Sequence, residues 1–154
     1  MISKKINDDL PLQTQTNKLL IEMPLVVNTY DIDVVGHVNN IVCFRWLEDL
    51  RNKLFSQIHP LEKLLEANHY PVVISCDVKY KKQIKLFDKL VGRIFLENHI
   101  HGIFTLKAEI LKDNYVAFTA IQKCVLMNLN TNKIYYGNIS DLVKHHSDFI
   151  TKIS

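Results

Sequence analysis

The spacing of apolar residues changes from a helical to an alternating pattern near residue 71, and this change limits the folds open to the chain. Residues 40–56 predict one amphipathic helix. Its apolar stripe consists of Cys43, Leu47, Leu50 and Leu54, and Phe44 and Trp46 widen it. After Pro71, strict alternation predicts a half-buried strand. The residues expected on its apolar face are Val72, Ile74, Cys76, Val78 and Tyr80. A long helix followed by antiparallel strands predicts an α+β fold with the helix packed on one face of the sheet.

The remaining elements follow from local patterns. A first strand, largely buried, is expected within residues 18–28, and a short helix should follow Pro60. Further strands are expected at 89–98, 103–112 and 115–127, a short extended segment at 134–136, and a terminal helix from Ser140. The turns His101-Gly102 and Asp113-Asn114 indicate antiparallel pairing. Residues 1–17 are polar and aperiodic and predict an N-terminal arm, so the folded domain should span residues 18–154.

Composition restricts the class of protein. The 154 residues are 47% hydrophobic and 23% charged, as expected for one soluble globular domain. A net charge of +3 is too small to indicate a nucleic-acid partner. Three cysteines without a Cys-x-x-Cys spacing favour free thiols in a reducing compartment, and no metal site is expected. We expect a cytoplasmic protein, because no secretory signal or membrane span is visible.

The stretch before the long helix carries the densest set of polar residues. Residues 30–40 contain two carboxylates, a glycine, a histidine and two asparagines. Either Asn39 or Asn40 is expected to cap the helix. Asp33 and His37 should therefore lie beside a helix N-terminus, where free amides and the macrodipole suit an oxygen that becomes negative during a reaction.

This stretch resembles a family signature. Asp-Ile-Asp-Val-Val-Gly-His-Val-Asn-Asn at 31–40, with Arg-Trp-Leu-Glu at 45–48, is similar to the motif of hotdog-fold thioesterases, in their 4-hydroxybenzoyl-CoA thioesterase-like and acyl-ACP thioesterase branches. A weaker match covers 80–82 and 87–90. The resemblance implies a single hotdog domain, an antiparallel sheet wrapped around a central helix. It also implies a homodimer or homotetramer with shared sites, acting in fatty acid metabolism on acyl thioesters of coenzyme A or acyl carrier protein, without a cofactor.

The sequence also departs from that family. Gln83 and Phe87 replace a proline and a glycine of the second motif, and Cys43 replaces an aromatic residue of the helix. Val35 stands where the plant acyl-ACP enzymes have an active-site asparagine. The carboxylate that remains is Asp33, which aligns with the catalytic aspartate of the 4-hydroxybenzoyl-CoA branch.

Thioester hydrolysis needs a group that activates water or attacks the carbonyl, and donors for the developing oxyanion. We expect Asp33 to act as general base or nucleophile, and the backbone amide of Asn40 to polarise the carbonyl. His37 either orients substrate or water or only bonds to nearby backbone. The residues expected to bind substrate are Gly36, Val38, Asn39, Tyr80, Lys81 and Lys82. The lysines would meet coenzyme A phosphates or an acidic carrier protein, unless they only guard a strand edge.

Other polar residues have simpler interpretations. Asp31 complements the helix dipole, Glu48 is solvated, and Cys43 is a small core residue rather than a nucleophile paired with His37. At the level of the whole protein, the alternative is a non-catalytic module that binds acyl-CoA or acyl-ACP. A hotdog hydratase is disfavoured, because the Asp-His spacing of that family is not found.

Overall fold

The computed structural model describes residues 19–139 and residue 141. The elements, in chain order, are β1 (Leu20–Leu25), the short 3-10 helix η1 (Thr29–Asp31), α1 (Asn40–Ile58), α2 (Leu61–Glu66), β2 (His69–Tyr80), β3 (Leu90–Ile100), β4 (Ile103–Lys112), β5 (Tyr115–Asn128) and β6 (Lys133–Tyr135). The expected polar arm over residues 1–17 lies outside the described residues, and so does the expected C-terminal helix except for Asp141.

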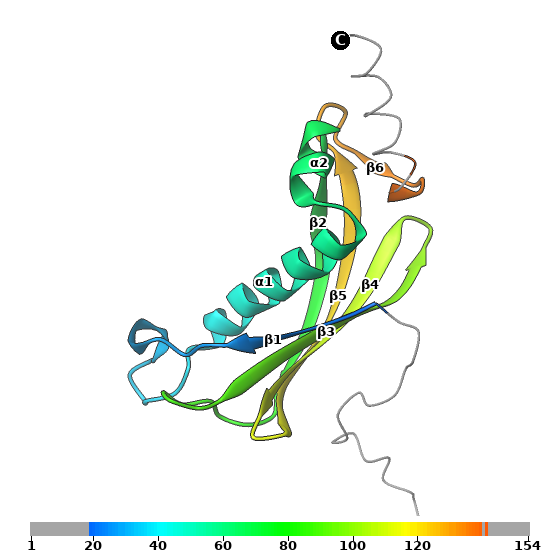
Figure 1. Ribbon diagram of the computed structural model, residues 1–154. Coiled ribbons are helices and arrows are strands. Elements are labelled where there is room, and N and C mark those ends of the chain that lie inside the picture. The colour runs from blue at the N-terminus through cyan, green and yellow to red at the C-terminus, as the bar shows by residue number, and fades with distance from the viewer. Residues whose placement is uncertain (1–18, 140, 142–154) are drawn as a thin grey trace, which may run out of the picture.

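The strands form one antiparallel sheet in the order β1-β3-β4-β5-β2, and β6 pairs with β5. Two-residue turns join β3 to β4 and β4 to β5, with positive φ at His101, Gly102, Asp113 and Asn114. The sheet curves, and α1 runs across one of its faces (Figure 1). The predicted α+β fold, a single hotdog domain with a sheet wrapped around a central helix, is confirmed.

Helix α1 supplies most of the helical side of the core. The predicted stripe of Cys43, Leu47, Leu50 and Leu54 is buried, and so is Trp46. The prediction for Phe44 was wrong, because its side chain is 44% exposed. At about 100° per residue, Phe44 and Trp46 lie on opposite flanks of the stripe, and only the Trp46 flank is buried.

Strand β3 lets the helix come close to the sheet. A Cβ atom at Gly92 would lie 2.9 Å from Leu25 Cδ1 and 3.0 Å from Leu50 Cδ1. A side chain at this position would therefore displace the side chains of Leu25 and Leu50. The glycine allows these two leucines to pack directly on the backbone of β3.

The first strand was predicted to be largely buried, and this was wrong. Only Leu25 of β1 is buried, and Leu20 is exposed. The reason is its position, since within the described chain β1 pairs only with β3 at one edge of the sheet. An apolar run does not reveal whether its strand is central or at an edge.

Strand β2 contains a bulge that the alternating sequence does not reveal. The register shifts between Val73 and Ser75, which leaves Ile74 without a partner on β5. Val73 packs on the core, whereas Val72 and Ile74 are exposed. The expectation that Val72 and Ile74 share a face with the later apolar residues was therefore wrong. Beyond the bulge, the side chains at 76, 78 and 80 do face the helix side of the sheet.

The other predicted elements are confirmed with small shifts at their ends. Helix α2 follows Pro60, and β2 begins at His69, before the expected start at Pro71. No helix in the described part of the chain is both long enough and apolar enough to cross a membrane.

Candidate active site

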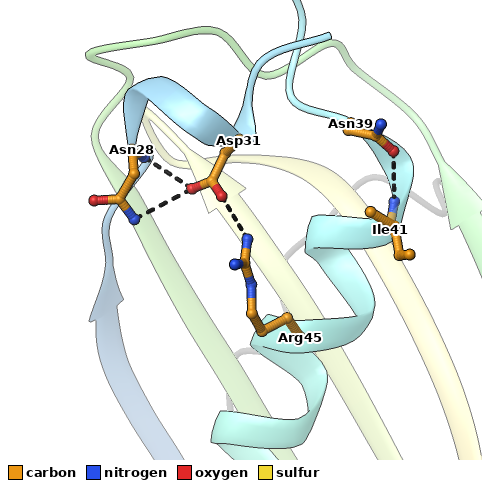
Figure 2. Close-up of polar contacts among 5 residues, drawn as sticks. All are labelled: Asn28, Asp31, Asn39, Ile41 and Arg45. Atoms are coloured by element: carbon orange, nitrogen blue, oxygen red, sulfur yellow. Dashed lines mark hydrogen bonds and ion pairs between the residues drawn. The ribbon is translucent and has the colours of Figure 1, made fainter.

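The loop between β1 and α1 is anchored by Asp31, whose side chain is only 1% exposed. Its Oδ2 accepts hydrogen bonds from the backbone N and the side-chain Nδ2 of Asn28, at 2.8 and 3.3 Å. Its Oδ1 forms an ion pair with the guanidinium of Arg45 on α1 (Figure 2). The backbone oxygen of Asp31 also accepts from Asn39 N at 2.8 Å. Asp31 thus ties the start of the loop to the helix, which is a structural role larger than dipole compensation.

Asp33 lies in a tight turn at the other end of this loop. Its Oδ1 accepts hydrogen bonds from the backbone N of Val35 at 3.0 Å and of His37 at 3.2 Å. Gly36 has φ +83°, a left-handed conformation that favours glycine. Within the described residues, no hydrogen bond engages Oδ2 of Asp33. One oxygen therefore fixes the side chain, and the second is available for chemistry.

The first turn of α1 supplies hydrogen-bond donors next to Asp33. Asn39 is the cap, because its Oδ1 accepts from Ile41 N at 3.1 Å (Figure 2). Asn40 is therefore the first helical residue, and its N–H has no acceptor among the described residues. Free amides at this position are a general property of helix N-termini. The Asn40 amide can thus donate to a ligand oxygen.

A pocket of about 290 Å³ joins this turn to the end of β2. Seven of the nine predicted site residues line it, namely Asp33, His37, Val38, Asn40, Tyr80, Lys81 and Lys82. Gly36 and Asn39 shape the turn and the cap but do not line it. Sequence reasoning missed the five other lining residues, which are Cys43, Gln83, Ile84, Ala117 and Phe118. Ala117 and Phe118 carry no local signal, because only strand register brings them there.

Backbone hydrogen bonds hold the two halves of the pocket together. Val38 N donates to Ile84 O at 2.7 Å, and the amides of Lys81 and Lys82 both donate to Ala117 O, at 2.8 and 3.0 Å. The Lys82 ammonium lies 3.9 Å from the ring centroid of Tyr115. These contacts position the backbone of the predicted substrate-binding lysines beside the loop.

Tyr80 links the strand to the helix N-terminus. Its hydroxyl donates to the backbone oxygen of Asn40 at 3.2 Å, and its ring packs edge-on against Phe118, with centroids 5.2 Å apart. Partial desolvation raises the pKa of the Tyr80 hydroxyl, and the negative charges that Cys43 and Cys76 carry when ionised raise it further. The hydroxyl therefore stays protonated and remains a donor at neutral pH.

Cys43 lines the pocket but is unsuited to nucleophilic attack. Burial raises the pKa of its thiol to about 11, so the reactive thiolate is scarce at neutral pH. Glu48 is exposed and does not line the pocket. In the described residues, His, Cys, Asp and Glu side chains form no group of three or more that could hold a metal ion.

The second motif contains the departure at Phe87. This residue has φ +71° and is 88% exposed. The left-handed conformation is the one that a glycine would adopt without strain. Lys85 N donates to Asp88 Oδ2 at 2.7 Å and closes the turn around it. The backbone has thus kept a conformation suited to glycine although the side chain is aromatic.

A family model for the thioesterase-like superfamily matches residues 27–143. The chain belongs to this superfamily. No curated protein sequence matches it.

Solved structures with the same fold include thioesterases. The DHNA-CoA thioesterase from Staphylococcus aureus is 17% identical, with a TM-score of 0.73, and the match covers 86% of this chain and 91% of that one. A hypothetical protein of the same organism, solved in complex with CoA, is 16% identical (TM-score 0.74, 85% of both chains). A Thermus thermophilus thioesterase complexed with coenzyme A and Zn is 21% identical (TM-score 0.67, 81% and 89%). At these identities the comparison supports the hotdog fold.

Proposed function

We propose that this protein hydrolyses acyl-CoA thioesters at the pocket between the loop 31–40 and the end of β2. The observation that carries the proposal is that Asp33 and Asn40 line one pocket, where Asp33 Oδ2 and the Asn40 amide have no hydrogen-bond partner among the described residues. Membership of the thioesterase-like superfamily supports thioester hydrolysis as the class of reaction. The CoA complexes of similar folds support coenzyme A as the carrier.

In the proposed reaction, the Asn40 amide donates to the thioester carbonyl oxygen and stabilises the negative charge that develops there. Asp33 Oδ2 either takes a proton from the attacking water or attacks the carbonyl carbon itself. If Asp33 acts as the base, the C–S bond breaks as water adds, the proton passes from Asp33 to the departing thiolate, and the thiol of coenzyme A and the free acid leave. If Asp33 attacks, the C–S bond breaks as an anhydride between the acyl group and Asp33 forms. Water then hydrolyses this anhydride, which releases the free acid, restores the carboxylate and supplies the proton of the thiol. Every step uses groups of the protein and water, so we propose that no cofactor takes part.

The residues around this centre have supporting roles in the proposal. Tyr80 fixes the carbonyl of Asn40 and thus the first helical turn. Lys81 and Lys82 lie at the pocket rim, where a positive charge favours the phosphates of coenzyme A. Acyl carrier protein, whose surface is acidic, is the alternative carrier for the same cations.

Steady-state hydrolysis of a panel of acyl-CoA thioesters tests the proposal, with Asp33→Asn compared with the parent. We expect loss of turnover by about 10²–10⁴-fold in the variant. Asp113→Asn, in the β4–β5 turn and away from the pocket, is the matched control. Unchanged turnover in Asp33→Asn would show that Asp33 has no catalytic role.

Tight binding of acyl-CoA without hydrolysis by the parent would favour a non-catalytic acyl-thioester module instead. Acyl carrier protein substrates run in parallel separate the two carriers.

We also propose a homodimer or homotetramer whose sites are shared between subunits, in the reducing cytoplasm. The free state of Cys43, Cys76 and Cys124 agrees with such a compartment. Sedimentation of the purified protein tests the assembly, and a monomer with full activity would contradict it.

A further inference from the structure

One buried amide in the sheet lacks a hydrogen-bond partner. Gln122 on β5 is 1% exposed, and its Oε1 accepts from Arg51 Nη1 of α1 at 2.6 Å. Its Nε2 is buried and has no partner among the described residues, and no other side-chain atom of these residues shares that condition. Since buried polar groups are nearly always paired, this amide indicates a position where an acceptor binds.

Arg51 differs from the other two arginines because it pairs with no carboxylate among the described residues. The sequence has three arginines, of which Arg45 pairs with Asp31 and Arg93 with Glu22. Arg51 is half-buried, and within the described chain its hydrogen bond goes to the neutral amide of Gln122 and not to a carboxylate. A guanidinium has five N–H donors. Arg51 and Gln122 together therefore present several donors and an uncompensated positive charge.

The strand register places this pair on the same sheet face as the pocket. Tyr80 pairs with Phe118, and Cys76 pairs with Gln122. Because side chains alternate, residues an even number of positions apart on β5 point to one face. Phe118 lines the pocket, so Gln122 lies four residues further, about 13 Å along the strand.

Helix α1 gives an independent estimate of the same separation. Cys43 lines the pocket, and Leu47 and Arg51 follow it at four-residue steps, which keeps them on one side of the helix. Eight residues correspond to about 12 Å of helix. Helix and strand thus agree that the Arg51–Gln122 pair lies about 12–13 Å from residues that line the pocket, a distance that an extended acyl chain can span.

The strip of β2 between these points is accessible. Val78 is half-buried, and Cys76 and Tyr80 are exposed. Partial desolvation of the sulfur raises the pKa of the Cys76 thiol, and the Arg51 charge opposes this effect, as expected if the guanidinium lies close to Cys76. An extended acyl group leaving the pocket over Val78 would bring its far end to Arg51.

We propose that Arg51 and Gln122 bind a carboxylate at the far end of the substrate's acyl group. The inference rests on the proposed thioesterase function and specifies its substrate class, a thioester of a dicarboxylic acid. A carboxylate matches the charge of Arg51 and accepts from Gln122 Nε2 at the same time. A plain alkyl end would leave Gln122 Nε2 and the remaining N–H groups of Arg51 without an acceptor, which disfavours it.

The test compares ω-carboxyacyl-CoA with alkyl-acyl-CoA thioesters of matched chain length. The parent should show a kcat/KM at least about 10-fold higher for the carboxylated member at the best length. Arg51→Met should abolish or reverse this preference, while turnover of the alkyl substrate changes by less than about threefold. Lys53→Met, on the exposed side of the same helix, is the control and should keep the parental preference.

Gln122→Glu provides a second variant that keeps the shape of the side chain. Its carboxylate would neutralise Arg51 and repel the substrate's carboxylate, so the preference should fall by about 10-fold or more with the alkyl substrate unaffected. Gln122→Met, checked for folding by thermal melting, should lose the preference without this repulsion.

Three results would overturn the inference. The parent could prefer the alkyl member, or Arg51→Met could lower both substrates equally, which is the signature of a structural role. The third is a change of oligomeric state in Arg51→Met, which would indicate that a second copy of the chain supplies the acceptor.

If the parent hydrolyses neither substrate, the thioesterase proposal fails by itself. Calorimetric binding of the two thioesters then tests the carboxylate preference separately.

Discussion

Asp31 and Asp33 lie two residues apart in one loop, and their surroundings are opposite in kind. Asp31 is buried and both of its carboxylate oxygens are engaged, by Arg45 and by Asn28. Asp33 is half-buried, and backbone amides hold only one of its oxygens. A fully engaged carboxylate cannot react without breaking the contacts that hold the loop. The difference shows how a short motif divides into an anchor and a reactive group.

The largest expected effect concerns Asp33. Asp33→Asn keeps an Oδ1 that accepts the amides of Val35 and His37, so the turn should survive. We expect turnover to fall by about 10²–10⁴-fold while the free energy of unfolding changes by less than about 0.5 kcal/mol. Kinetics and urea denaturation on the same preparation measure both. A large loss of stability with retained turnover would make Asp33 an anchor like Asp31.

Replacing Arg45 tests the role of Asp31 as the anchor of the loop. Arg45→Met leaves the Asp31 carboxylate buried without its cation but still bonded to Asn28. We expect a destabilisation of about 2–3 kcal/mol, with the turnover of folded molecules within about threefold of the parent. Urea denaturation and active-site-normalised rates provide the readouts. A selective loss of turnover would show that the two carboxylates are not independent.

Cys43 is the other group in the pocket that could be reactive, and pH distinguishes it from Asp33. Burial raises the pKa of Cys43 and of Cys124 to about 11, from 9.0 for an unburied thiol. The unfolded chain therefore loses these protons first as pH rises. Their contribution to stability is complete below about pH 9 and is lost as pH rises through about 11.

For each thiol the loss should reach about 2–3 kcal/mol. Denaturation between pH 8 and 12 measures the slope, and a Cys43→Ala/Cys124→Ala double variant should show a shallower one. Equal slopes in the two proteins would contradict the buried protonated state.

The smallest effects concern the two turns that meet the pocket. Gly36→Ala introduces a side chain at positive φ, although no atom lies within 4 Å of the new Cβ. The cost should be about 1 kcal/mol of conformational strain. Phe87→Gly should act in the opposite direction and stabilise by about 0.5–1 kcal/mol, since its backbone is already left-handed. Thermal melting compares them, and shifts of the same sign would refute the strain argument.

Much of the fold was predictable because its signals are local. The stripe of α1, the two tight turns and the antiparallel strands follow from residue spacing alone. The burial of β1 was not predictable, because an edge strand and a central strand can have the same apolar content. The exposure of Phe44 depends on the direction of the helix stripe, which a count of apolar residues does not give.

Sequence predicted the part of the candidate site that lies in one motif, but not the contacts between distant residues. Asp33, His37 and Asn40 are contiguous in a motif, so sequence could indicate them together. Tyr80 was predicted from the resemblance alone, because its hydrogen bond to Asn40 joins residues 40 positions apart and leaves no local pattern. The Arg51–Gln122 contact joins residues 71 positions apart. No local pattern distinguishes a buried glutamine with a free amide from one that is fully paired.

The bulge at Ile74 makes β2 tolerant of the loss of one residue at this point. Val73 pairs with Cys124 and Ser75 pairs with the adjacent Lys123, so Ile74 is the extra residue of the strand. Deleting Ile74 would restore one-to-one pairing, with Val73 still on the core and Tyr80 still at the pocket. In a strand without a bulge, the same deletion would turn every residue beyond it to the opposite face. Among related sequences, the number of residues between Val73 and Tyr80 should therefore vary by one without loss of either contact.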